Sequence, residues 1–87
     1  MTASATRDRE RVKVLLAVNR TPMSTVDIAG RAGLRREDTR SALESLRRKG
    51  LVRWHVSHDG ASLRHGLSRQ HITPLGEYVA QMVRARP

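Results

Sequence analysis

Residues 23–52 read MSTVDIAGRAGLRREDTRSALESLRRKGLV, and this stretch decides the fold. Ser24 is a favourable N-cap residue with an acidic residue three positions later, which predicts that a short helix begins there. Gly33 supplies the permissive backbone of a sharp turn. A longer helix is then expected over residues 35–49, with Gly50 capping its end. The segment therefore predicts a helix, a tight turn and a second helix.

The second of these helices is amphipathic. Leu43 and Leu46 lie on one face at helical spacing, with Ala42 and Thr39 beside them. The opposite face carries five basic residues: Arg35, Arg36, Arg40, Arg47 and Arg48. An apolar stripe that faces the core and a basic face that points outward suit a helix lying in a DNA major groove.

A β-hairpin is expected directly after this helix. Residues 51–57 alternate apolar and polar side chains, as a half-buried strand does. Trp54 lies on the apolar phase of this strand and is expected in the core or at the base of the hairpin. Residues 58–62 form a polar turn that contains glycine, and a less regular return strand is predicted over residues 63–72.

A further helix is expected after the hairpin. Thr73 is a favourable N-cap, and Pro74 suits the first helical position. An apolar stripe at helical spacing follows, made of Leu75, Tyr78, Val79, Met82 and Val83. This stripe is expected to pack on the first helix or on its copy in a second subunit.

Upstream, residues 7–19 predict a first helix with Val12, Leu15 and Leu16 on its apolar face. Residues 1–6, MTASAT, are small and polar and are predicted to be disordered. The expected fold is mainly α with a small β-hairpin (α+β), in the order helix, helix, helix, strand, strand, helix. It forms a single domain over residues 7–87.

This pattern resembles the winged helix-turn-helix regulators of the MarR, PadR and ArsR groups. Ala29, Gly33 and Leu34 match the helix-turn-helix pattern. The segment LESLRRKGLVRW resembles the passage from the recognition helix into the wing, and ITPLGEYVA resembles the start of the last helix. The resemblance implies a sequence-specific regulator that binds double-stranded DNA, most simply a repressor and a homodimer. Residues 35–49 would enter the major groove, and the wing, residues 51–72, would lie on the adjacent minor groove or backbone.

The resemblance also implies which residues contact DNA. Those nearest the bases would be Arg35, Arg36, Asp38, Thr39, Arg40 and Ser41. Further contacts would come from Ser24, Thr25, Arg47, Arg48, His58, Ser62, Arg64 and Arg69. Arg36 and Arg40 are the first candidates for base recognition. The alternative for any one of these arginines is a solvated helix face that pairs with Glu37, Asp38 or Glu44. The apolar stripe of the last helix would be the dimer contact.

Two positions depart from the pattern of the family. Arg35 stands where Ser or Thr is common before the recognition helix, and Thr39 stands where a branched apolar residue is usual. Both departures concern the start of this helix and its local packing.

The charge supports a polyanionic partner. The chain has 17 basic and 8 acidic residues, for a net charge of +9. Residues 31–53 alone carry eight basic and three acidic side chains, so the charge is concentrated at the motif. Fifteen of the basic residues are arginines, which fits bidentate recognition of phosphate and guanine, although a GC-rich coding bias predicts the same ratio.

Several functional classes are disfavoured by what the sequence lacks. It has no cysteine, glycine-rich phosphate loop or positioned acid and base set, so no enzyme is expected and no cofactor is inferred. The 87 residues leave little room for a deep ligand cavity, and no small-molecule ligand is inferred. With no signal core and no membrane-spanning run, the expected location is the cytoplasm, on the nucleoid.

Alternatives remain open. Four histidines, His55, His58, His65 and His71, raise a metal-sensing hypothesis, but their spacing does not reproduce a metal-ligand set. A winged-helix module that binds protein would be expected to have an acidic or apolar recognition helix. The helix expected over residues 35–49 is strongly basic, which argues against this alternative. RNA binding is disfavoured by the few aromatic residues available for stacking. An architectural, excisionase-like role would use the same contacts as a specific regulator.

Overall fold

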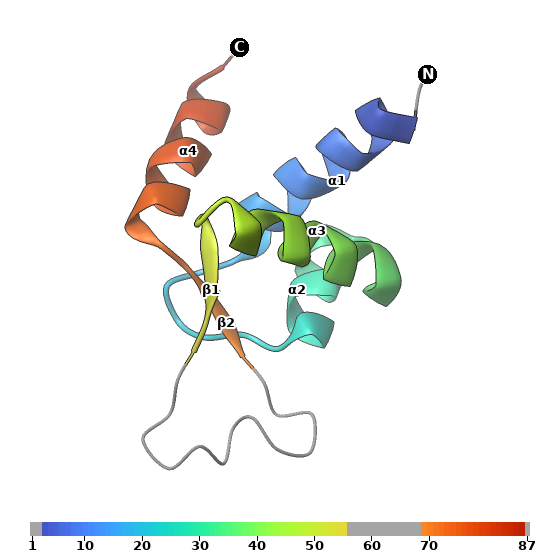
Figure 1. Ribbon diagram of the computed structural model, residues 1–87, viewed down its shortest axis with the longest axis horizontal. Helices are drawn as coiled ribbons and strands as arrows, with labels where there is room; N and C mark the ends of the chain where they lie inside the picture. Colours follow the sequence, from blue (N-terminus) through green and yellow to red (C-terminus); the bar gives the residue numbers. More distant parts are fainter. Residues whose placement is uncertain (1–2, 56–68, 87) are drawn as a thin grey trace.

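The computed structural model describes residues 3–55 and 69–86 of the chain. Within these ranges the helices α1 (Ala3–Ala17), α2 (Thr25–Ala32) and α3 (Arg36–Arg48) come first. The strands β1 (Val52–Trp54) and β2 (Gln70–Ile72) follow, and α4 (Pro74–Ala85) comes last (Figure 1). This order confirms the predicted class, a mainly α chain with a small β-hairpin.

The helix-turn-helix forms through the predicted local signals. The Ser24 hydroxyl accepts a hydrogen bond from the Asp27 amide at 3.2 Å and caps α2. Gly33 ends this helix in the left-handed conformation, with φ 69°, and its amide donates to the Ala29 carbonyl. Leu34 then packs against the core, which fixes the corner before α3. The predicted cap and turn are both confirmed.

The start of α3 contains Arg35 and Thr39, the two positions that depart from the winged helix-turn-helix pattern. Arg35 takes the N-cap position but its side chain makes no capping bond, and its Nε instead donates to Asp38 Oδ2 at 3.1 Å. Thr39 is fully buried, and its hydroxyl donates to the Arg35 carbonyl at 2.9 Å. Thr39 thus fills the place of an apolar residue because its one polar hydrogen has a backbone partner.

The core lies where α1, α2 and α3 meet beside the strand pair and α4 (Figure 1). Its buried members are Val14, Leu15, Ala17, Val18, Ile28, Ala42, Leu43, Leu46, Leu51, Val52, Ile72 and Ala80. All of these are aliphatic, as expected from a chain without phenylalanine.

Two expectations about α1 were wrong. The helix begins at Ala3, inside the tail that was predicted to be disordered, and ends at Ala17, before residue 19. Residues 3–6 contain two alanines and neither proline nor glycine, so nothing in them stops a helix. The buried face also differs from the prediction: Val12 is exposed and Val14 is fully buried. The reason is that α1 packs chiefly against α3, which turns Val14 inward.

The two strands pair in antiparallel, with Val52 opposite Ile72 and Trp54 opposite Gln70. Gln70 also pairs through its backbone with Met23, which joins the strand pair to the loop before α2. Residues 51, 55 and 69 of the predicted strands lie outside the observed strands. The predicted turn and residues 56–57 and 63–68 lie outside the described residues. Of the two places predicted for Trp54, the core is wrong: its side chain is 41% exposed, at the last residue of β1.

The last helix is docked at its first turn. The Thr73 hydroxyl accepts from the Gly76 amide at 3.0 Å and donates to the Gly50 carbonyl at 2.7 Å. Gly76 and Ala80 are buried, whereas Leu75, Tyr78 and Met82 are exposed. The predicted cap and the proline at the helix start are confirmed, but most of the apolar stripe faces outward. In Figure 1, α4 and α1 diverge toward the two ends of the chain.

None of the helices in residues 3–55 and 69–86 combines the length and apolar character that crossing a bilayer requires.

Candidate nucleic-acid interface

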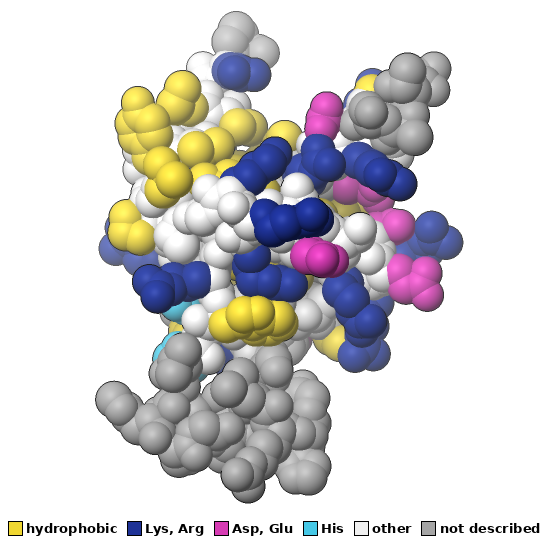
Figure 2. Space-filling view, in the orientation of Figure 1, with side chains coloured by type: hydrophobic (Ala, Val, Ile, Leu, Met, Phe, Trp, Pro, Cys, Tyr) yellow, Lys and Arg dark blue, Asp and Glu magenta, His cyan; other side chains and the backbone are white. Residues whose placement is uncertain are grey.

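The outward face of α3 is basic. Arg36 and Arg40 are one helical turn apart and exposed, and Arg48 is exposed near the end of the helix. Figure 2 shows Lys and Arg side chains gathered over the part of the molecule where α3 runs in Figure 1. Among the described residues, neither Arg36 nor Arg40 forms an ion pair. Their guanidinium groups are therefore available to an anionic partner.

A groove of about 320 Å³ borders this face, between the start of α2, the helix α3 and the paired strands. Three arginines of α3 line it, namely Arg36, Arg40 and Arg47. Ser24 and Thr25 line it from the start of α2, and Trp54 and Gln70 from the strands. The groove thus brings together residues that were predicted nearest the bases, Arg36 and Arg40, and residues predicted as further DNA contacts, Ser24, Thr25 and Arg47.

Gln70 links two residues that line this groove, Arg47 and Thr25. It is fully buried, its Nε2 donates to Thr25 Oγ1 at 3.2 Å, and its Oε1 accepts from Arg47 Nη1. The sequence prediction missed this residue. The available signal was strand alternation, since Gln70 shares the inward phase of Ile72 and is a polar residue at a core position.

Arg47 lies over the exposed indole of Trp54, with its Cζ 4.2 Å from the ring centroid. Partial burial lowers the pKa of the Arg47 guanidinium from its ordinary value, and Glu44 opposes this effect. The group remains charged at neutral pH, because an arginine pKa starts far above 7. Arg47 is thus a cation that is stacked and tethered rather than a freely mobile side chain.

Other predicted DNA contacts lie elsewhere. Arg48, Asp38 and Ser41 line a separate hollow of about 230 Å³ between α1 and α3. Asp38 is also paired with Arg35. Thr39 is a correction to the predicted set, because a fully buried side chain cannot contact a base.

The predicted contacts of the wing are only partly described. Arg69 is exposed beside β2, and its carbonyl accepts from the His55 amide at 2.8 Å. His58, Ser62 and Arg64 lie outside the described residues. The rings of His55 and His71 meet edge to face with centroids 6.2 Å apart. Residues 3–55 and 69–86 contain no group of three potential ligands that could hold a metal ion.

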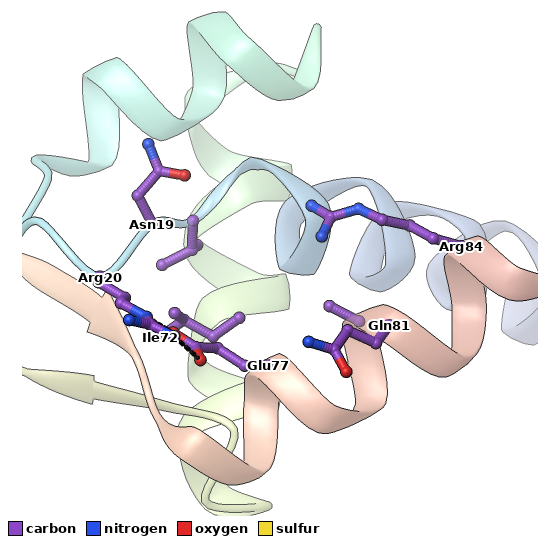
Figure 3. A pocket seen from close by; sticks show the side chains of 8 residues that line it. Asn19, Arg20, Ile72, Glu77, Gln81 and Arg84 are labelled. Carbon is purple, nitrogen blue, oxygen red and sulfur yellow. Dashed lines mark hydrogen bonds and ion pairs between the residues drawn. The ribbon is translucent and has the colours of Figure 1, made fainter.

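A second hollow of about 270 Å³ lies between the end of α1 and α4 (Figure 3). Arg20 and Glu77 point toward each other across its rim and form a bidentate ion pair, with Arg20 Nη2 2.9 Å from Glu77 Oε2. Gln81 and Arg84, which lie further along α4 than Glu77, also line the hollow (Figure 3). The pair ties the loop after α1 to the first turn of α4.

The Arg20 pair predicts a pH dependence. Its hydrogen bonds and charge lower the pKa of the Glu77 carboxyl below its ordinary value of 4.5. A lowered pKa in the folded state contributes stability above the unfolded pKa, and that stability is lost as pH falls through the folded pKa. In Arg20→Gln, we expect the pKa of Glu77 to rise toward 4.5.

Carboxyl-carbon NMR titration of Glu77 measures this change directly. The thermal midpoint of the unaltered chain should also fall more steeply on acidification below about pH 4.5 than that of Arg20→Gln. Arg31→Gln is the matched control, because it removes one exposed charge elsewhere and should leave the Glu77 titration unchanged. An equal Glu77 pKa in all three chains would mean that the ion pair does not persist in solution.

Comparison with known proteins bears on the fold. No family model matches the sequence, and no curated protein matches it. Among solved structures, the chain is similar to a MarR-family transcriptional regulator from Silicibacter pomeroyi, with a TM-score of 0.70 and 21% identity over 87% of this chain. A second MarR-family transcription regulator has a TM-score of 0.68 and 18% identity over 88% of this chain. The chain spans about half the length of these proteins, 49% and 48%. The predicted winged helix-turn-helix fold is confirmed.

Proposed function

We propose that this chain is a transcriptional regulator that binds double-stranded DNA in a sequence-specific manner, most simply as a repressor in the cytoplasm. The N-terminal half of α3 enters the major groove, and the hairpin lies on the adjacent minor groove or backbone. One observation carries the proposal: Arg36 and Arg40 of α3 are exposed, form no ion pair within the described residues, and line a groove that continues to the paired strands. The similar structures, both transcriptional regulators, support it.

Arg36 and Arg40 are the residues that we assign to base recognition. They occupy the first two turns of α3 and are exposed. A bidentate contact from arginine to guanine O6 and N7 contributes about 1 to 3 kcal/mol of discrimination. A contact to phosphate instead adds affinity for every sequence. Ser24 acts as the cap of α2 in this proposal, because its hydroxyl already accepts from the Asp27 amide.

We further propose that the regulator is a homodimer. Tyr78 is 61% exposed, and Leu75 and Met82 are exposed beside it, so α4 presents an apolar face outward. Val79 and Val83 are half-buried along the same helix. A second copy packed on this face would remove the apolar surface from water and place two recognition helices about a two-fold axis. The DNA site would then be an inverted repeat with half-sites about one helical turn apart.

The experiment that tests the function is selection from a random-sequence duplex pool at two salt concentrations, followed by sequencing of the bound DNA. An inverted repeat that survives the higher salt is the expected result. Sedimentation of the free protein at twice the 9.8 kDa chain mass would support the dimer independently. Binding without an enriched motif would favour an architectural role. No binding at either salt would overturn the proposal and favour a protein-binding module.

A further inference from the structure

The arrangement around Arg47 is more elaborate than a solvated helix face requires. A side chain on the outward face of α3 is held by a fully buried glutamine from β2 and lies over an aromatic ring from β1. Ordering an arginine costs side-chain entropy, so a surface arginine normally stays mobile. Three separate elements here cooperate to fix one guanidinium group.

The fixed charge has no internal partner in the described part of the chain. The ion pairs there join Arg11 to Asp8, Arg20 to Glu77 and Arg35 to Asp38, and none involves Arg47. Of the five N–H donors of Arg47, one is used by Gln70. The guanidinium carbon lies over the Trp54 ring, and the Arg47 side chain lines the groove, where its remaining donors can meet an anion. The group is therefore ready to donate hydrogen bonds to an anion.

The position of Arg47 on α3 indicates which anion. It lies in the last turn of the helix, eleven residues after Arg36, at the junction with the hairpin. When the N-terminal half of a recognition helix enters the major groove, its C-terminal half comes beside the sugar-phosphate backbone. The Thr25 hydroxyl lines the same groove, and because it accepts from Gln70, its own hydrogen is free to donate.

We propose that Gln70 and Trp54 are positioning residues that hold Arg47 as a fixed contact to one DNA backbone phosphate, seated in the groove between α2, α3 and the hairpin. This inference rests on the proposed DNA-binding function and adds to it a specific anchor. Fixing the guanidinium before binding reduces the entropy lost on association, so the contact contributes more than a mobile arginine would. Phosphate oxygens would accept charge-assisted hydrogen bonds from the Arg47 N–H donors that Gln70 does not use.

A double-mutant cycle tests the coupling, with fluorescence anisotropy on a fluorescein-labelled mixed-sequence duplex of roughly 30 base pairs, or about three helical turns. Gln70→Leu removes both hydrogen bonds of Gln70. We expect it to weaken binding about fivefold in the chain with Arg47 and less than about twofold in the Arg47→Ala background. Arg47→Ala alone should lower the slope of log affinity against log salt by about 0.9, the value for one phosphate contact.

A purely structural role for Gln70 predicts the same weakening in both backgrounds, and that result would overturn the inference. Because Gln70 is buried, its substitution lowers stability, so the exposed Trp54 provides the second cycle. Trp54→Leu should weaken binding only when Arg47 is present, and Trp54→Phe, which retains an aromatic face, should restore it. Equal effects of Trp54→Leu with and without Arg47 would contradict the proposal.

Duplex binding by the unaltered chain distinguishes failure of the proposed DNA-binding function from failure of the Arg47 phosphate contact, the anchor. Absence of duplex binding by it would refute the proposed function, and the anchor with it. Duplex binding by the unaltered chain, together with additive cycles and an unchanged salt slope in Arg47→Ala, would leave the proposed function standing and refute the anchor alone.

Discussion

Replacing both Arg36 and Arg40 by alanine is expected to weaken binding to the selected DNA site by about 2 to 6 kcal/mol, which is roughly 30-fold or more. Both side chains are exposed in the first half of α3, and neither is paired within the described residues. Because they carry no core contacts, the thermal midpoint should change little. Anisotropy titration against the selected site and a scrambled duplex measures the loss and its sequence dependence.

The control is the double variant Arg31→Ala with Arg86→Ala, which removes the same charge from exposed positions on α2 and just after α4. Loss of general electrostatic attraction should affect both double variants similarly, whereas loss of base recognition should affect only the pair on α3. If Arg36→Ala with Arg40→Ala reduces affinity no more than the control, α3 is not the recognition helix. A selective loss on the specific site assigns these arginines to bases, and an equal loss on both duplexes assigns them to phosphates.

The elements that could be predicted from sequence are those whose cause is local. The Ser24 cap, the Gly33 turn and the Thr73 cap each depend on a hydrogen bond or a backbone conformation within a few residues. The partners are close in the chain, so residue type and spacing are sufficient to identify them. The helix-turn-helix and the start of α4 follow from these signals.

The site itself depends on distant partners, and there the prediction was incomplete. Gln70 bonds to Arg47 and Thr25, which lie 23 and 45 residues away in the chain. Nothing in the sequence near Gln70 shows that these partners exist. Trp54 was expected in the core or at the base of the hairpin, because its apolar character was readable. Its contact with Arg47 at the edge of the groove could not be predicted, since Arg47 lies on another element.

Thr39 shows the limit of surface assignments on a helix. The family resemblance placed it among the base contacts, although helical spacing puts it on the apolar face with Leu43 and Leu46. The structure buries it, and the bond from its hydroxyl to the Arg35 carbonyl satisfies its polarity. A threonine whose hydroxyl has an internal backbone partner can be buried, so helical spacing was a better guide to Thr39 than its polar residue type.

Gly76→Ala is expected to destabilise the fold more than any other single methyl addition at the glycines of the described residues. A Cβ on Gly76 would lie 2.1 Å from the Leu51 carbonyl oxygen and 2.7 Å from Ile72 Cγ1. Side-chain adjustment cannot relieve a collision with backbone, so α4 must move away. That movement would break the bond from the Thr73 amide to the Leu51 carbonyl and the bond from its hydroxyl to the Gly50 carbonyl.

We expect the free energy of unfolding to fall by about 3 kcal/mol or more, the upper end of the range for overpacking. For a domain of this size, that loss lowers the thermal midpoint by more than about 12 °C. Thermal denaturation followed by circular dichroism measures the shift. A midpoint within about 2 °C of the unaltered chain would mean that α4 is not docked against Leu51 as the structure has it.

Gly30→Ala is the matched control because it adds the same methyl group to a helical glycine with open space around it. No atom lies within 4 Å of the added Cβ, and Gly30 is exposed in the interior of α2. Alanine there gains helix propensity, so stability should rise by about 0.5 to 1 kcal/mol. If the free energy of unfolding falls in Gly76→Ala and rises in Gly30→Ala, the requirement for glycine at position 76 is steric, because both glycines are helical. Gly76 belongs to the ITPLGEYVA segment, which resembles the start of the last helix in winged helix-turn-helix regulators. The need for glycine there would then have a physical cause, the close approach of α4 to the corner between α3 and β1.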